Sequence, residues 1–103
     1  MDEYETLVDY NFVGETLVES VTIRKTSDDE TYPSGWDYSC HLGTVDGLTL
    51  LRYDNAHEST KGHERHTAAG DDHHRDFPGM EAVLVSFWAA ADEYWDVEDG
   101  SPP

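Results

Sequence analysis

Three of the six histidines in this 103-residue chain, His57, His63 and His66, fall within ten positions. Imidazole exchanges protons near neutral pH, so two histidines can act as general base and general acid. Neutral imidazole also binds zinc, nickel or copper, and the His-x-x-His spacing of His63 and His66 suits two ligands of one ion. The spacing fits both chemistries, and it also fits ordinary polar loop residues.

Arg52 and Asp54 lie just before these histidines, in the apolar segment "LTLLRYDN". Alternate side chains of a strand share one face, which predicts one face with Leu48, Leu50, Arg52 and Asp54 and the other with Thr49, Leu51, Tyr53 and Asn55. The planar fork of an arginine suits a phosphate group, and an aspartate can orient a neighbouring imidazole. A solvated ion pair at the end of a strand is the alternative interpretation.

Several strands are predicted upstream of this segment. "LVDYNFVGETLVESVTIRKT" predicts a strand that ends near Thr26 and pairs with Leu7–Val13 across Gly14. "WDYSCHLG" alternates, with Trp36, Tyr38, Cys40 and Leu42 on one face, and "TVDG" is typical of a hairpin turn. Downstream, "ERHTA" predicts a short strand, whereas "GDDHHRDFPG" reads as a polar stretch.

The clearest element begins at Met80, where apolar residues recur at helical spacing. The predicted stripe consists of Met80, Val83, Leu84, Phe87, Trp88 and Ala91. Pro78 stands near the expected start of the helix. The order of elements predicts an α+β fold: a small antiparallel sheet of four to five strands with one C-terminal helix packed on one face.

The length predicts one domain over residues 1–103, with frayed ends at residues 1–6 and 97–103. No apolar run approaches the roughly 20 residues of a membrane span, and the acidic N-terminus does not resemble a signal peptide, so we expect a soluble cytoplasmic protein. Cys40 is the single cysteine. An internal disulfide and a cysteine-based zinc knuckle are therefore excluded.

The charge is strongly acidic, with 23 Asp and Glu against 6 Lys and Arg and a net charge of −17. The acidic residues are scattered along the chain, which favours the surface of a protein from a salt-loving cytoplasm, where molar salt shortens the Debye length to about 3 Å. A nucleic-acid mimic that binds basic partners is the alternative.

Three segments resemble the TumE family of toxin–antitoxin proteins: "DYSCHL", "LLRYDNAH" and "HERH". The family has a strand like "YSYH", an arginine-containing strand that runs into Asp-Asn-Ala-His, and a His-rich "HHKH" segment. The resemblance spans about residues 18–95 and is most specific at Arg52–His57. This chain differs at Glu58 and Glu64, where the family has histidines, while Arg65 keeps the positive charge of the family's lysine.

The resemblance implies a toxin with a cognate antitoxin, often one with a helix-turn-helix. By analogy with other small toxins, it suggests a metal-independent ribonuclease or another block of translation, with RNA as the target. In the ribonuclease hypothesis His57 and His66 are the acid–base pair and Asp54 orients a histidine. Arg52, Arg65 and His63 then bind the substrate. No cofactor is required, and a homo-oligomer is compatible with the sequence.

Two other functions remain open. In the first, the chain is a non-catalytic metal-binding or regulatory module that holds zinc through His57, His63 and His66. In the second, it is an acidic interaction protein whose histidines are dispensable.

Overall fold

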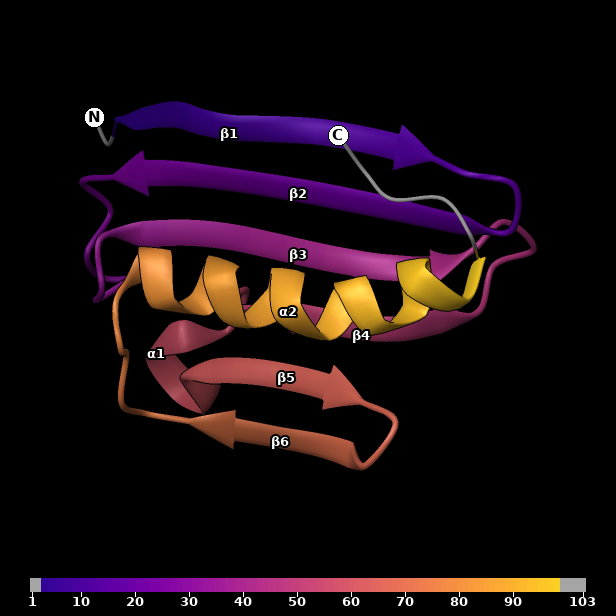
Figure 1. The fold of residues 1–103 in the computed structure, drawn as a ribbon. Helices are drawn as coiled ribbons and strands as arrows, with labels where there is room; N and C mark the ends of the chain where they lie inside the picture. Colours follow the sequence, from indigo (N-terminus) through magenta and orange to yellow (C-terminus); the bar gives the residue numbers. More distant parts are fainter. Residues whose placement is uncertain (1–2, 99–103) are drawn as a thin grey trace.

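A computed structural model describes residues 3–98 and contains one six-stranded antiparallel sheet (Figure 1). The strands follow one another across the sheet in the order of the chain, so every neighbour is reached through a short connection. They are β1 (Tyr4–Val13), β2 (Leu17–Thr26), β3 (Trp36–Thr44), β4 (Thr49–Asp54), β5 (His63–Thr67) and β6 (Gly70–His74). Two helices complete the fold, the four-residue α1 (Glu58–Lys61) and the long α2 (Met80–Glu98).

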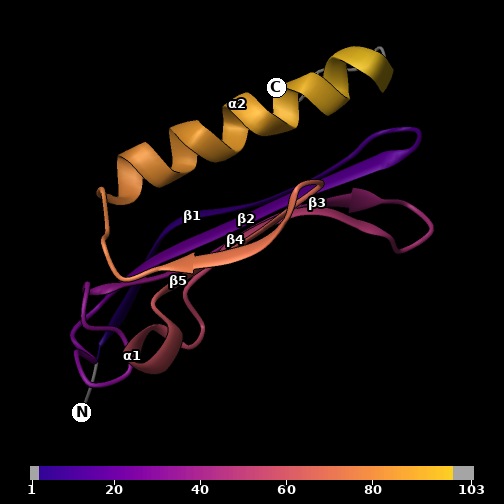
Figure 2. The same cartoon turned by 90° about the horizontal axis from the view of Figure 1, so that it is seen from below.

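The helix α2 packs against one face of the sheet, over β3 and β4, whereas α1 lies on the opposite side (Figure 2). The core between α2 and the sheet confirms most of the predicted stripe, since Met80, Val83, Phe87 and Ala91 are buried. Trp95 is also buried, but Trp88 is 41% exposed and donates its indole N–H to the Tyr10 hydroxyl. No described helix is long and apolar enough to cross a membrane.

The α+β class and the single helix on one face are confirmed, but the sheet has six strands rather than four to five. The additional strand is β6, whose residues are all exposed. It pairs with β5 through the backbone across the turn at Ala68 and Ala69, and it begins at Gly70, which has φ +122°. A strand with no buried side chain shows no hydrophobic alternation, which is why "GDDHH" reads as a loop.

Regular structure extends into both segments that were predicted as frayed ends. Tyr4 to Thr6 pair with β2 at Thr26 to Arg24, and α2 runs through Val97. The remaining residues of the predicted frayed ends, 1–2 and 99–103, lie outside the described part of the chain.

A β-bulge in β4 changes which side chains share a face. Leu42 pairs with Leu51, but the next residue of β3, Gly43, pairs with Thr49, which leaves Leu50 as an extra residue. The bulge packs Leu50 against the core and lets Thr49 reach His41 on the opposite face. The predicted grouping of Leu50 with Arg52 and Asp54 is therefore wrong for Leu50, and that of Thr49 with Leu51 and Tyr53 is wrong for Thr49.

Candidate functional site

The face of the sheet that α2 does not cover, called the open face here, carries a row of polar side chains across four strands. His41 of β3 is the register partner of Arg52 of β4, Arg52 is the partner of His66 of β5, and His66 is the partner of Asp71 of β6. Side chains directly opposite on antiparallel strands have Cβ atoms about 5 Å apart. These four side chains are defined here as the polar row. Each lies next to the following one across the sheet, in the order His41, Arg52, His66 and Asp71.

His66 is held in place by its neighbour in the polar row, Asp71. His66 shares a hydrogen bond between its Nδ1 atom and the Asp71 carboxylate, so its Nε2 atom points away from that contact. A carboxylate on one imidazole nitrogen fixes the tautomer and the orientation of the ring. The side chain of His66 is 36% exposed, and solvent reaches it.

Arg52 stands between the two histidines with half of its side chain exposed. Its Nε atom lies 3.1 Å from an Asp54 carboxylate oxygen, so Asp54 orients the arginine rather than a histidine. The ion pair predicted as the alternative interpretation is thus present. A hollow of about 100 Å³ adjoins it on this part of the sheet and is lined by Arg52, Glu64, Arg65, Asp71, Asp72 and His73.

His41 lies over Gly43, and its Nε2 atom is 3.1 Å from the Thr49 hydroxyl. A Cβ atom on Gly43 would stand 2.8 Å from His41 Cε1 and 2.7 Å from the Leu48 carbonyl oxygen, so only glycine fits beneath the ring. Partial burial lowers the pKa of His41, and the positive charge of Arg52 lowers it further. Both effects favour the neutral imidazole, the form that accepts a proton.

Gly43→Ala should displace the His41 ring and lower the free energy of unfolding by about 1–3 kcal/mol, because two contacts below 3.0 Å must relax. Urea titration would measure the stability, and the NMR shifts of the His41 ring protons would report the displacement. Gly47→Ala is a poor comparison because Gly47 has φ +104°. Ser39→Ala, an exposed position on the same strand and face, is the suitable control.

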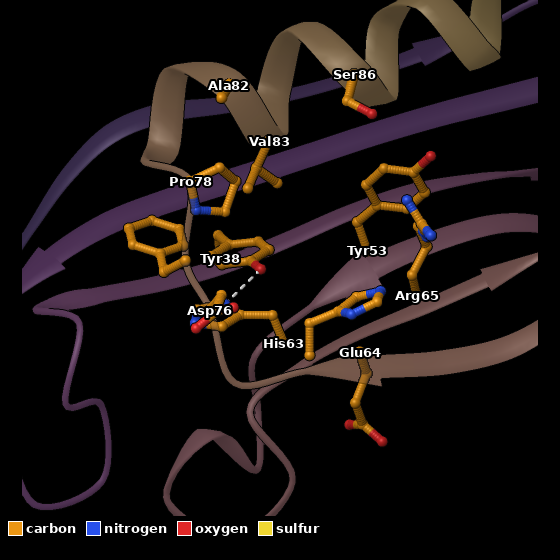
Figure 3. Close-up of a pocket in the computed structure, with 12 residues that line it drawn as sticks. Tyr38, Tyr53, His63, Glu64, Arg65, Asp76, Pro78, Ala82, Val83 and Ser86 are labelled. Carbon is orange, nitrogen blue, oxygen red and sulfur yellow. Dashed lines mark hydrogen bonds between the residues drawn. The ribbon is translucent and has the colours of Figure 1, made fainter.

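His63 and Arg65 lie on the other face of the sheet, under α2, and line a cavity of about 380 Å³ (Figure 3). His63 is buried; its Nδ1 atom is 2.8 Å from the Tyr38 hydroxyl and its ring stacks on Phe77 at 4.6 Å. Arg65 makes a two-pronged ion pair with Asp72, at 2.9 and 3.2 Å. His63 therefore lies on the opposite face from the polar row. Arg65 alternates to that face as well, although it also contributes to the hollow beside Arg52.

A buried network joins the end of β4 to α1. Asn55 is fully buried; its side-chain oxygen accepts from the Tyr38 amide, and its Nδ2 atom donates to the Trp36 carbonyl and to Glu58. Glu58 also accepts from the amide and the hydroxyl of Ser34, and its Oε1 atom is 4.0 Å from His63 Nε2. The most specific motif of the sequence, Arg52–His57, thus contains both the exposed Arg52 and a buried structural residue, Asn55.

The family model that matches this sequence is described as toxin TumE, and it covers residues 3–95. The chain belongs to the TumE toxin family. No curated protein and no solved structure matches it. The resemblance seen in three short segments therefore extends over nearly the whole sheet and helix.

In this TumE-family chain the motif segments converge on the open face. "DYSCHL" supplies His41, "LLRYDNAH" supplies Arg52, and "HERH" supplies His66. Sequence reasoning missed His41 and Asp71 as candidate site residues. The alternation of "DYSCHL" places His41 on the face opposite to the buried Cys40, and this pattern could have indicated His41. Nothing in the sequence indicates Asp71, because every residue of β6 is exposed and the strand has no hydrophobic pattern.

The metal-binding alternative requires His57, His63 and His66 to meet, and the structure of this TumE-family chain does not bring them together. His63 and His66 are on opposite faces of β5, and His57 is exposed where α1 begins. Within residues 3–98 no group of three or more His, Cys, Asp or Glu side chains is arranged to hold a metal ion. Two residues of odd separation on a strand cannot share a face, which is why the His-x-x-His pair diverges here.

His63 should make the stability of the protein depend on pH. Burial lowers its pKa, and the nearby Glu58 carboxylate opposes that shift only in part. The unfolded chain then binds a proton that the folded chain does not, so stability is full above the unfolded pKa of about 6.5 and falls as the pH drops below it. Urea unfolding at constant high salt should give a smaller loss between pH 7.5 and pH 5.5 for His63→Phe than for wild type. An equal loss in both proteins would contradict this.

Proposed function

We propose that this chain is the toxin of a toxin–antitoxin pair and that it cleaves RNA without a metal ion, using the polar row of the open face. The observation that carries the proposal is the register of His41, Arg52 and His66 on three neighbouring strands. Two imidazoles on either side of an arginine provide a base, an acid and a phosphate-binding group within reach of one phosphodiester.

The roles follow from the surroundings of each side chain. His41, whose pKa is lowered by burial and by Arg52, takes the proton from the ribose 2′-hydroxyl. The 2′-oxygen forms a bond to phosphorus while the bond from phosphorus to the 5′-oxygen breaks. His66, oriented by Asp71, donates a proton to the leaving 5′-oxygen, and Arg52 binds the non-bridging oxygens of the phosphate. The products are a 2′,3′-cyclic phosphate and a 5′-hydroxyl.

The geometry favours His41 over His57 as the partner of His66. His57 stands at the start of α1 and outside the polar row, whereas His41 is adjacent to Arg52 on it. Asp54 acts through Arg52, at 3.1 Å, and Asp71 has the role beside a histidine that was predicted for Asp54. Arg65 and His63 face the other side of the sheet, so we do not include them in the cleavage site.

The net charge of −17 opposes the approach of RNA at low salt, and screening in molar salt removes most of this repulsion. We therefore propose that the protein works in a salt-rich cytoplasm. The cleavage rate should then rise with salt before it falls, because the same salt weakens the contact of Arg52 with phosphate.

The test is expression of the chain without its antitoxin in a salt-loving host, with growth and total RNA followed together. Growth arrest with RNA fragments that end in 2′,3′-cyclic phosphate supports the proposal. The purified protein should make the same ends in excess EDTA. Arrest with intact RNA would contradict the ribonuclease, and cleavage that EDTA abolishes would contradict the metal-independent mechanism.

A further inference from the structure

The cavity under α2 is unused by the proposed RNA cleavage, since it lies between α2 and the sheet, on the face opposite the polar row (Figure 3). It lies where α2 passes the β5–β6 hairpin, which α2 leaves largely uncovered. Its walls include the rings of Tyr38, Tyr53 and Phe77 and the imidazoles of His63 and His74. Ala82 and Ser86 of α2 stand along its upper edge (Figure 3). A volume of about 380 Å³ exceeds that of any single side chain.

The charges around the cavity favour a cation. The one guanidinium in the lining, that of Arg65, is neutralised by its ion pair with Asp72. The carboxylate of Glu64 belongs to the open-face side of β5 and points away from the cavity (Figure 3). Asp76 is left as the lining carboxylate that no cation of the described residues engages, in a chain of net charge −17.

Aromatic walls with a carboxylate at the edge match the chemistry of a guanidinium, which stacks on rings and pairs with carboxylates. The chain already shows one such contact, since Arg65 Cζ lies 5.9 Å from the centre of the Tyr53 ring (Figure 3). A phosphate-bearing ligand would meet Asp76 and the net negative field instead. A basic protein segment fits this surface better than RNA does.

We infer that the cavity is a docking site for the cognate antitoxin, and that an arginine of a basic antitoxin segment enters it between Tyr38, Tyr53 and Phe77 and pairs with Asp76. This rests on the toxin–antitoxin pairing of the proposed function, but not on RNA cleavage. The antitoxin then binds the helix side of the sheet and leaves the polar row uncovered.

The experiment measures the affinity of the purified chain for its antitoxin, taken as the product of the adjacent gene whose co-expression restores growth. Ser86→Arg puts a positive charge at the edge of the cavity, whereas Val85→Arg adds the same charge on the exposed side of the same helical turn. Ser86→Arg should weaken binding at least tenfold and Val85→Arg less than threefold. Circular dichroism would confirm that both variants are folded.

A second pair of variants tests the charge. Asp76→Asn should weaken binding several-fold, whereas Asp92→Asn, on an exposed position of α2, should not. One antitoxin arginine, changed to glutamine, should cause no further loss when it is combined with Asp76→Asn. Equal affinities for all four chain variants would overturn the inference.

RNA cleavage by the same proteins separates this inference from the proposed function. Ser86→Arg should cleave RNA as wild type does while it escapes the antitoxin. Loss of cleavage with unchanged antitoxin binding would assign the cavity to the RNA and overturn the inference. Conversely, antitoxin binding that depends on Ser86 and Asp76 in a protein that cleaves no RNA would support the docking site and refute the ribonuclease.

Discussion

His66→Ala should abolish growth arrest and lower the rate of RNA cleavage by about 10²–10⁴-fold, the usual contribution of a positioned general acid. The side chain is 36% exposed and its side-chain hydrogen bond is with the exposed Asp71, so its removal should not unfold the protein. Cleavage of a fluorescent RNA in high salt measures the rate, and urea unfolding checks the fold.

The informative comparison is between His41→Ala and His57→Ala. The polar row predicts that His41→Ala also loses about 10²–10⁴-fold, while His57→Ala retains the activity of wild type. The opposite order would restore the pairing of His57 with His66 that the sequence suggests. If His66→Ala still arrests growth at equal abundance, the polar row is not the toxic site.

Asp71→Asn gives a graded test of the same arrangement. Asparagine keeps the size of the side chain but removes the charge beside His66 Nδ1, so a smaller loss than in His66→Ala is expected. Cleavage of the same fluorescent RNA in high salt measures the loss, and urea unfolding checks that the variant keeps its fold. Wild-type activity in a folded Asp71→Asn protein would show that Asp71 does not orient His66 for catalysis.

Local sequence patterns were sufficient for elements that bury an apolar face. The alternation of "WDYSCHLG" places Tyr38, Cys40 and Leu42 in the core, and burial raises the pKa of the Cys40 thiol to about 12, which makes it a packing residue. The periodic stripe from Met80 locates α2 correctly. In both elements the residues that face the core are apolar, and their spacing in the sequence indicates which face is buried.

The site was harder to predict because its residues are brought together by register. His41 and His66 are 25 positions apart in the sequence and become neighbours of Arg52 only through two strand pairings. The bulge at Leu50 moves Thr49 to the His41 side, and neither the bulge nor the fully exposed β6 leaves a hydrophobic pattern. The cluster of three histidines in the sequence predicts the candidate site less well. His63 and His66 are three positions apart on β5, and this odd separation puts them on opposite faces of the sheet.

Asn55 shows that the most specific motif of the chain combines two different roles. It follows Asp54 directly, but it is fully buried and its amide group serves three partners: the Tyr38 amide, the Trp36 carbonyl and Glu58. These bonds continue the pairing of β3 with β4 past the last backbone pair and fix the turn into α1. A buried amide group that satisfies three polar groups stabilises a fold strongly, because each group left alone would cost about 1–3 kcal/mol.

Asn55→Ala should therefore lower the free energy of unfolding by about 3–5 kcal/mol, enough to leave a small domain largely unfolded at low salt. Asn11→Ala, on the exposed edge strand β1, should change it by less than about 1 kcal/mol. Urea unfolding in high salt measures both. If Asn55→Ala is stable yet inactive, Asn55 belongs to the site; if it is unstable but active where it remains folded, toxicity depends on the polar row and Asn55 only holds β4 and α1 in place.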